Sequence, residues 1–324
     1  MLTVVVGVFA ALTYGAADFL GGIASKRMSP IRVTAIGAVS GLVILVAAAP
    51  LIGGHWSWEA VLYGGISGIT GAVAITLLYA CLAIGPMSIL SPLTALVSAF
   101  VPLMASVIRG ERLPVLGYIA IGIALVAVVL VGFVKEEGAV RPSLKALLMA
   151  IGSGTMIGAF LILIDLTPDD SGLVPLIANR AVNGTIMFAV VGALFLVVRR
   201  SNRASRSETP IETSDARDGR RRWRRGEDQK WSSLQAPARI GMLSPGWRAG
   251  FWVAVVCGMI DATANVLLLF GLRIGELTVM SVLTALYPAG TIILAAIVLR
   301  ERIAPVQVVG LVLALVAAGM LALA

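Results

Sequence analysis

The hexapeptide SPLTAL at residues 91–96 returns as SVLTAL at residues 281–286, 190 positions later and with one substitution. The match continues on both sides at this offset and pairs Gly68 with Gly258, Ala74 with Ala264, Gly85 with Gly275, and Glu111-Arg112 with Glu301-Arg302. A weaker match at offset 143 pairs Gly15 with Gly158, Ala35 with Ala178, and Gly41 with Gly184. The two offsets differ by 47 residues, about the length of a polar stretch at 199–248. The sequence therefore predicts a duplicated unit with an insertion inside its second copy.

The composition is that of a membrane protein. Of the 324 residues, 59% are hydrophobic and 13% are charged, whereas soluble domains carry about 25% charged residues. The net charge of +8 does not indicate nucleic-acid binding, because 13 of the 25 Lys and Arg residues fall within 199–248. One histidine, His55, and two cysteines in apolar runs offer no metal-ligand spacing, so no metal or cofactor is expected.

Apolar runs long enough to cross a bilayer fill most of the chain. The predicted spans are 2–24, 31–52, 58–84, 87–108, 114–134, 144–166, 173–198, 249–273, 277–299 and 305–324. The first span lacks a basic leader and a cleavage site, so we expect it to be retained. The stretch 199–247 is rich in Ser, Arg, Asp and Glu, and we expect it to be disordered.

Five spans in each unit force the two units to enter the membrane from opposite sides. The fold class expected is an all-α polytopic membrane protein with ten transmembrane helices arranged as two inverted five-helix repeats, at residues 1–135 and 141–324. Inverted repeats are typical of secondary transporters. Lys and Arg are more numerous in the loops on the side of the long insertion. The positive-inside rule places this insertion in the cytoplasm and both termini outside.

The segment 85–112, GPMSILSPLTALVSAFVPLMASVIRGER, its echo at 275–302 and the opening YGAADFLGG at 14–22 resemble EamA-type transporters of the drug/metabolite transporter superfamily. The resemblance covers nearly the whole chain outside the insertion. It implies a cavity lined by the third, fourth, eighth and ninth spans, and it implies export across the cell membrane. Members move amino acids, nucleotides, sugars or drugs, so the resemblance does not name a substrate.

Asp18, in the second half of the first span, is a candidate for proton coupling or cation binding. A carboxylate in the middle of a bilayer costs at least about 2.5 kcal/mol and usually faces a functional cavity. The alternative is a structural carboxylate that pairs with Arg180 or is hydrogen-bonded near the cytoplasmic interface. Asp261 and Asn265 share one face of the eighth span and form a candidate substrate-binding pair. Their alternative role is an interhelical hydrogen bond.

Arg180 is the one arginine well inside a span, and it could clamp a substrate carboxylate or phosphate. Its alternatives are an ion pair with Asp165 or Asp18, or a side chain that reaches toward the interface. Tyr14, Tyr79 and Tyr287 are candidates for stacking on a substrate, although core packing is the more usual role for any one of them.

Prolines interrupt the two repeated helices. Pro92 and Pro102 in the fourth span and Pro288 in the ninth remove helical hydrogen bonds and are candidate hinges. Thr94 and Thr284 could bond the freed carbonyls. The glycine pairs Gly37/Gly41, Gly64/Gly68 and Gly154/Gly158 predict close helix packing.

We therefore expect a secondary transporter, not an enzyme, that moves small polar or amphipathic metabolites or drugs, with protons as a candidate coupling ion. A lipid flippase, a channel and an intramembrane enzyme are the alternatives, and the last is disfavoured because GxSxG and HExxH motifs are absent. Expected partners are a small-molecule substrate, membrane lipids, anionic lipid at the Arg220–Arg225 cluster and a second copy of the chain. The cluster could equally be a simple topology determinant.

Overall fold

The structure, a computed structural model, describes residues 1–25, 28–84, 87–110, 112–132, 143–207, 250–298 and 304–323, and is all helical there. Its helices are α1 (Leu2–Ser25), α2 (Pro30–Ile52), α3 (Trp58–Ile84), α4 (Met87–Ile108), α5 (Val115–Gly132), α6 (Leu144–Asp165), η1 (Asp169–Ser171), α7 (Val174–Ser207), α10 (Phe251–Ile274), α11 (Leu277–Thr284), α12 (Tyr287–Val298) and α13 (Pro305–Leu323). Seven apolar helical segments of the described chain are long enough to cross a membrane. Shorter apolar segments lie within α4, α5 and α13.

Local sequence signals set several helix boundaries. Pro30 and Pro305 occupy the first positions of α2 and α13, where the missing N–H of proline costs nothing. Ser143 caps α6 by accepting a hydrogen bond of 3.2 Å from the Ala146 N–H. Gly53, with φ of +73°, ends α2 in a conformation that glycine adopts easily.

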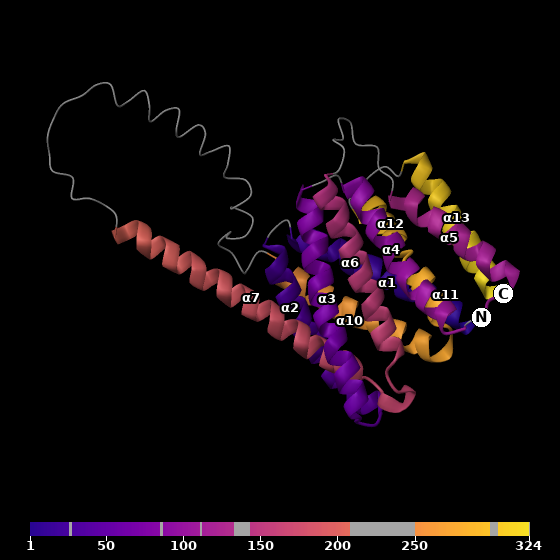
Figure 1. Cartoon of the computed structure of the whole chain (residues 1–324), viewed down its shortest axis with the longest axis horizontal. Helices are drawn as coiled ribbons and strands as arrows, with labels where there is room; N and C mark the ends of the chain where they lie inside the picture. Colours follow the sequence, from indigo (N-terminus) through magenta and orange to yellow (C-terminus); the bar gives the residue numbers. More distant parts are fainter. Residues whose placement is uncertain are drawn as a thin grey trace, which may run out of the picture.

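The helices form one bundle with two edge pairs (Figure 1). Helices α5 and α13 pack against each other at one edge, and α2 and α7 pack at the opposite edge. Between them, α1 packs on α10 and α12, while α3 and α4 pack on α6. Large apolar side chains such as Val43, Phe100 and Leu315 are exposed on the outside of the bundle. Lipid tails would cover these faces, as expected of a multi-pass membrane protein.

Glycine allows the close packing that the sequence predicted. A Cβ atom at Gly158 of α6 would lie 2.7 Å from Val101 Cβ of α4. One at Gly68 of α3 would lie 2.5 Å from the Asn179 carbonyl oxygen of α7. Gly258 of α10 is packed equally closely on α2. Any side chain at these positions would separate the helices, so the small-residue pattern is confirmed as a packing feature.

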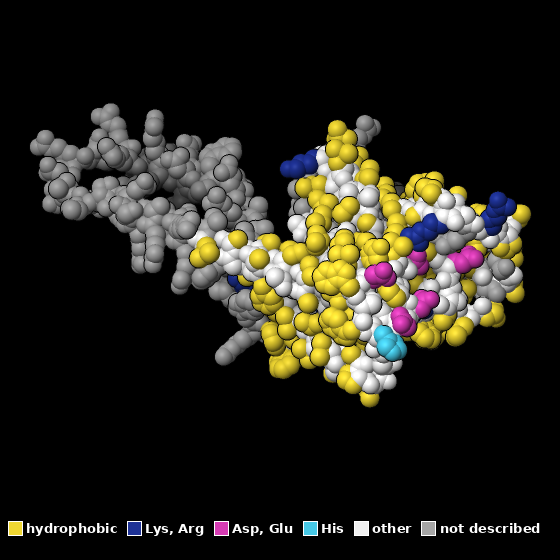
Figure 2. All heavy atoms as spheres, turned by 60° about the horizontal axis from the view of Figure 1, so that its bottom comes forward, with side chains coloured by type: hydrophobic (Ala, Val, Ile, Leu, Met, Phe, Trp, Pro, Cys, Tyr) yellow, Lys and Arg dark blue, Asp and Glu magenta, His cyan; other side chains and the backbone are white. Residues whose placement is uncertain are grey.

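Several contacts join the helix ends where α1 begins and α13 ends, which we call the terminal end. Arg109 at the end of α4 pairs with Asp165 at the end of α6 at 2.6 Å. Arg273 of α10 donates hydrogen bonds to Ser171 Oγ (3.0 Å) and to the Gly172 carbonyl oxygen (2.9 Å) in the α6–α7 connection. The backbone N–H of His55 donates to the Asp170 carbonyl oxygen at 2.8 Å. Figure 2 shows acidic side chains gathered around the histidine on this face.

The opposite end, where α1 ends and the long insertion begins, is the insertion end. Here α7 continues through Ser207 and projects from the bundle (Figure 1), so its 34 residues span about 51 Å against about 30 Å of hydrocarbon. The prediction of disorder from residue 199 is therefore wrong for 199–207, which are helical. The rest of that prediction, and the Arg220–Arg225 cluster, lie outside the described residues.

The predicted ninth span consists of two helices, with the break beside Pro288, one of the prolines expected to remove helical hydrogen bonds. Helix α11 ends at Thr284, and α12 starts at Tyr287. Pro288 has no N–H to donate to the Thr284 carbonyl oxygen four residues earlier, so the helical ladder stops between them. The repeated helix α4 continues from Met87 to Ile108 although it contains Pro92 and Pro102, so the expected hinges at these two prolines do not interrupt the helix.

Candidate functional site

A pocket of about 200 Å³ lies in the middle of the bundle. Helices from both halves of the chain line it: α1, α3 and α4 from the first, and α6, α7, α10, α11 and α12 from the second. Its lining residues are Tyr14, Asp18, Gly71, Ala74, Ile75, Leu78, Ser98, Ile157, Phe160, Leu161, Asn179, Arg180, Asn183, Asp261, Asn265, Thr284, Ala285 and Tyr287. Cavities lined by apolar residues with a few polar groups are the usual form of small-molecule sites.

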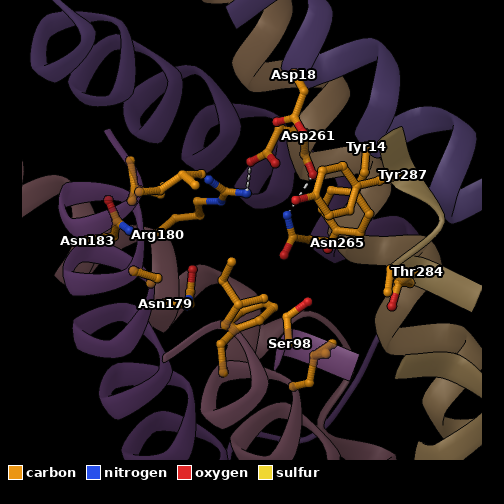
Figure 3. Close-up of a pocket in the computed structure, with 18 residues that line it drawn as sticks. Tyr14, Asp18, Ser98, Asn179, Arg180, Asn183, Asp261, Asn265, Thr284 and Tyr287 are labelled. Carbon is orange, nitrogen blue, oxygen red and sulfur yellow. Dashed lines mark hydrogen bonds and ion pairs between the residues drawn. The ribbon is translucent and has the colours of Figure 1, made fainter. Parts of the chain in front are cut away.

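The structure brings together most of the candidates that the sequence suggested (Figure 3). Tyr14, Asp18, Arg180, Asp261 and Asn265 all line the pocket. Tyr14 and Asp18 are one turn apart on the inner face of α1, as are Asp261 and Asn265 on α10. Because all of these groups project from packed helices, the scaffold holds them in fixed relative positions.

Arg180 of α7 forms an ion pair with Asp261 of α10. The two side chains are 12% and 31% exposed, so water reaches the pair from one side. The sequence had suggested Asp18 or Asp165 as partners, and both suggestions are wrong. Asp165 lies at the terminal end beside Arg109, and Asp18 has no ion pair among the described residues.

Asn265 does not make the interhelical bond that was the alternative to a binding role. Its side-chain N–H₂ group donates to the Asp261 backbone carbonyl oxygen at 2.7 Å, within α10. This bond turns the amide along the helix and leaves its oxygen to face the pocket (Figure 3). Asp261 thus takes part in two interactions that orient neighbouring pocket residues, one through its carboxylate and one through its backbone.

The two candidate threonines have different positions. Thr284 lines the pocket at the end of α11, and its hydroxyl donates to the Met280 carbonyl oxygen at 2.7 Å. Thr94 is fully buried outside the pocket and bonds the Leu90 and Ala150 carbonyl oxygens, which ties α4 to α6. The side chain of Tyr79 lies outside the described part of the structure.

Sequence reasoning missed part of the site. Asn179 and Asn183 flank Arg180 on α7, and all three line the pocket, although Arg180 alone was the candidate from the seventh span. The available signal was that Asn183 follows Asn179 by four residues and Arg180 by three, a spacing that puts Asn183 on the same helix face as each of them. Ser98 and the apolar Ile157, Phe160 and Leu161 gave no signal, because such residues are common in any apolar helix.

Two polar atoms of the pocket residues are buried without a partner among the described residues: the Tyr14 hydroxyl and the Asn183 Oδ1. Asn183 is only 5% exposed. Buried polar groups nearly always have hydrogen-bond partners, because an unpaired one costs about 1–3 kcal/mol. Water or a bound molecule in the pocket would supply the missing partners.

The two sides of the pocket differ in polarity at matched positions of the duplicated sequence. Asp18 of α1 corresponds at offset 143 to Leu161 of α6, and Asp261 of α10 corresponds at offset 190 to Gly71 of α3. All four residues line the pocket. The pairs Tyr14/Ile157 and Asn265/Ile75 repeat this relationship at the same offsets. We call α1 and α10 the polar wall and α3 and α6 the apolar wall.

The fold and the pocket together define a multi-pass membrane protein with a small-molecule site inside its helix bundle. The profile of the EamA-like transporter family matches residues 1–133 and 234–323. The chain belongs to this family, which confirms the resemblance noted in the sequence, and it is a membrane transporter of the drug/metabolite type.

The other comparisons add the fold but no function. A solved structure described only as "Crystal structure of protein" aligns with a TM-score of 0.64 at 15% identity, and covers 99% of this chain and 96% of its own. At this identity the likeness concerns the fold alone. The comparison with curated proteins gives no match.

Proposed function

We propose that the protein is a secondary transporter that moves a small polar or amphipathic molecule across the cytoplasmic membrane by alternating access. The pocket carries this proposal. It lies within the bundle, it is lined by helices from both halves of the chain, and it holds charged side chains that an apolar bundle would otherwise exclude. Two halves that meet around one site can expose it alternately to the two sides by rocking.

The two halves act as inverted repeats in this proposal, and matched glycines support it. Gly15 of α1 packs on α12, and its counterpart Gly158 of α6 packs on α4. Gly68 of α3 packs on α7, and its counterpart Gly258 of α10 packs on α2. In both comparisons, the helix contacted in one half is the counterpart of the helix contacted in the other: α12 corresponds to α4, and α7 corresponds to α2. The glycine contacts therefore agree with the sequence match of α1 to α6 and of α3 to α10. Because each span and its counterpart are five positions apart in the order of spans, the two members of each pair run in opposite directions.

An ion gradient or exchange of substrates drives transport, since the sequence has no phosphate-binding GxxxxGK[ST] motif. Asp18 is the candidate coupling group. It faces the pocket, it lies about one turn beyond Tyr14, and it lacks a cationic partner in the described part of the chain. A carboxylate in this position can take up a proton from one side and release it to the other. Net movement is export, with the insertion and the basic loops in the cytoplasm.

The exposure of residues in the second half of α1 supports a pocket that opens toward the insertion end. Asp18 is exposed even though it lies in the second half of a helix packed between α10 and α12. One turn further along, Gly22 is exposed too, and a Cβ atom there would meet nothing within 4 Å. At the terminal end the Arg109–Asp165 pair and the Arg273 hydrogen bonds hold helix ends together. In this arrangement the pocket receives its substrate from the cytoplasm.

Uptake into proteoliposomes tests the proposal. The purified full chain is reconstituted and exposed to a panel of labelled amino acids, amines, nucleosides, sugars and lipophilic drugs, with and without an imposed pH gradient. We expect saturable uptake of at least one compound class and acceleration by the gradient. Asp18→Asn should remove the acceleration. Glu59→Gln, at the terminal end in the first turn of α3, is the control and should behave as the parent does.

Three results would contradict the proposal. Ion currents far above the turnover of a transporter would favour a channel. Gradient-accelerated transport that survives both Asp18→Asn and Asp261→Asn would remove the coupling role assigned to the pocket carboxylates. Movement of a fluorescent phospholipid between leaflets without uptake of any soluble compound would favour a flippase.

A further inference from the structure

The charges that line the pocket do not balance. Two carboxylates, Asp18 and Asp261, and one guanidinium, Arg180, face the cavity. Arg180 is committed to Asp261. Asp18 lies near enough to Asp261 for the two charges to interact, yet no cation of the described residues pairs with it. With all three groups ionised, the pocket carries one net negative charge.

Unpaired polar atoms and aromatic rings lie with this charge. The Tyr14 hydroxyl is buried without a partner one turn from Asp18 on the same helix. Figure 3 shows the rings of Tyr14 and Tyr287 beside the two carboxylates at one end of the pocket. Tyrosine faces attract ammonium groups, and a carboxylate accepts their hydrogen bonds. This end of the pocket therefore offers the two kinds of group that hold an organic cation.

The apolar wall provides the complementary surface for the rest of a ligand. Ile75 and Leu78 of α3 face the pocket together with Ile157, Phe160 and Leu161 of α6. Three of these, Ile75, Ile157 and Leu161, occupy the positions that correspond to Asn265, Tyr14 and Asp18 in the other repeat. The pocket thus has charged groups on one side, which can hold the charged group of a ligand, and an apolar surface on the other, which can hold the rest of it.

We propose that the pocket selects a small organic monocation, with its protonated amine at Asp18 and the rings of Tyr14 and Tyr287, and its apolar body against the α3–α6 wall. The inference rests on the proposed function in treating this pocket as the transport site, and it deepens that function by naming the charge class of the substrate.

The geometry disfavours the other charge classes. A zwitterion such as an amino acid would need a free guanidinium for its carboxylate, but Arg180 is already paired with Asp261. An anion would enter a pocket of net negative charge. A neutral compound of the same shape could pack against the apolar wall, but the negative charge of the Asp18 carboxylate would have no cationic partner.

Four ligands of one shape and different charge test the proposal: 2-phenylethylamine, phenylalanine, 3-phenylpropanoate and 2-phenylethanol. Binding to the full chain in nanodiscs of neutral lipid is measured by calorimetry at neutral pH. We expect the amine to bind at least tenfold more tightly than each of the other three. The charge-assisted contact with Asp18 is lost in 3-phenylpropanoate and 2-phenylethanol, and in phenylalanine it is offset by a carboxylate that has no free guanidinium to bind. Either loss accounts for a difference of this size.

Variants at Asp18 assign the preference to that carboxylate. Asp18→Asn should weaken amine binding at least tenfold and should not weaken binding of 2-phenylethanol, whereas Asp18→Glu should retain the preference for the amine. Glu59→Gln is the matched control, because it removes an acidic group outside the pocket. Melting temperature and gel-filtration profile show whether each variant is folded, and 2-phenylethanol binding at least as tight as in the parent shows that the pocket is intact.

The inference is overturned if the protein binds phenylalanine, 3-phenylpropanoate or 2-phenylethanol more tightly than the amine. It is also overturned if the amine does not bind at millimolar concentration, or if Asp18→Asn binds the amine as tightly as the parent does. The proposed transport function is tested independently of the cation preference. If a bound zwitterion or neutral compound is carried across the membrane, the transporter survives without the cation preference. If the amine binds but no compound crosses the membrane, the pocket chemistry stands and the transport role does not.

Discussion

Arg180 of α7 and Asp261 of α10 form an ion pair in the central pocket, and both of their counterparts in the first half of the chain are glycines. Gly37 corresponds to Arg180 at offset 143, and Gly71 corresponds to Asp261 at offset 190. Gly37 lies against Gly258 and allows α2 to approach α10, while Gly71 lines the pocket. Both residues of the ion pair thus lie in the second half of the chain, although the helices that carry them have counterparts in the first half.

Neutralising one member of this pair should destabilise the protein more than neutralising both. Arg180→Gln leaves two carboxylates together, and Asp261→Asn leaves the guanidinium without its partner. We expect each single change to cost about 1–2 kcal/mol and the double change to recover at least half of that loss. Thermal unfolding of the four proteins in one detergent forms the double-mutant cycle.

The Arg109–Asp165 pair at the terminal end is the comparison for this cycle. Its side chains are about as exposed as those of the pocket pair, 35% and 18%, but the pair lies at an end of the bundle, where bulk solvent weakens an ion pair. Arg109→Gln with Asp165→Asn should show a coupling near zero. Equal coupling in the two cycles would contradict the view that the pocket pair is set in a less polar environment.

Glycine substitutions should separate packing positions from open ones. Gly258→Val would place a side chain against Gly37 and Ser40 of α2, so we expect loss of the folded monomer peak in gel filtration. Gly22→Ala should be tolerated, because nothing lies within 4 Å of the added Cβ atom. A folded Gly258→Val protein would show that α2 and α10 can separate without loss of the bundle.

Replacement of the proline after the α11–α12 break should join the two helices. Pro288→Ala restores an N–H that can donate to the Thr284 carbonyl oxygen. We expect slower amide exchange at residues 285–290 and several-fold slower transport, with ligand affinity within twofold of the parent.

Pro102→Ala is the matched control, because α4 is continuous at that proline. It should leave both exchange and transport near the parent values. If Pro288→Ala leaves the exchange of 285–290 unchanged, proline is not the cause of the break. If exchange slows and transport does not, the break is not a hinge for transport.

Tags after the fifth and last helices test the inverted arrangement. In a background with Cys81→Ala and Cys257→Ala, single cysteines are introduced as Gly138→Cys and Ala324→Cys. A membrane-impermeant maleimide applied to intact cells should label the second site at once and the first only after permeabilisation. Both sites must first be shown to react fully in detergent. Labelling of both in intact cells would place the two repeats in the same orientation and remove the basis for alternating access.

Much of the fold could be predicted from the sequence. Apolar runs located the helices, and glycines four residues apart predicted close helix packing, as at Gly68 and Gly158. The break after Thr284 was harder to predict, because Pro92 and Pro102 interrupt hydrogen bonding in α4 without ending the helix. Whether a proline breaks a helix depends on what packs beside it, and a single sequence does not contain that information.

For the site, the sequence determined which charged residues had to lie inside the bundle, because Asp18, Arg180 and Asp261 occur in spans that lipid would otherwise surround. Only the tertiary structure decided their partners. Residues 81 positions apart in the chain, Arg180 and Asp261, meet because α7 and α10 face the same cavity, and Asp18 is left without a cation among the described residues. Which charged residues pair depends on how each helix is rotated and how closely it approaches its neighbours. The packing of many small side chains together determines this arrangement.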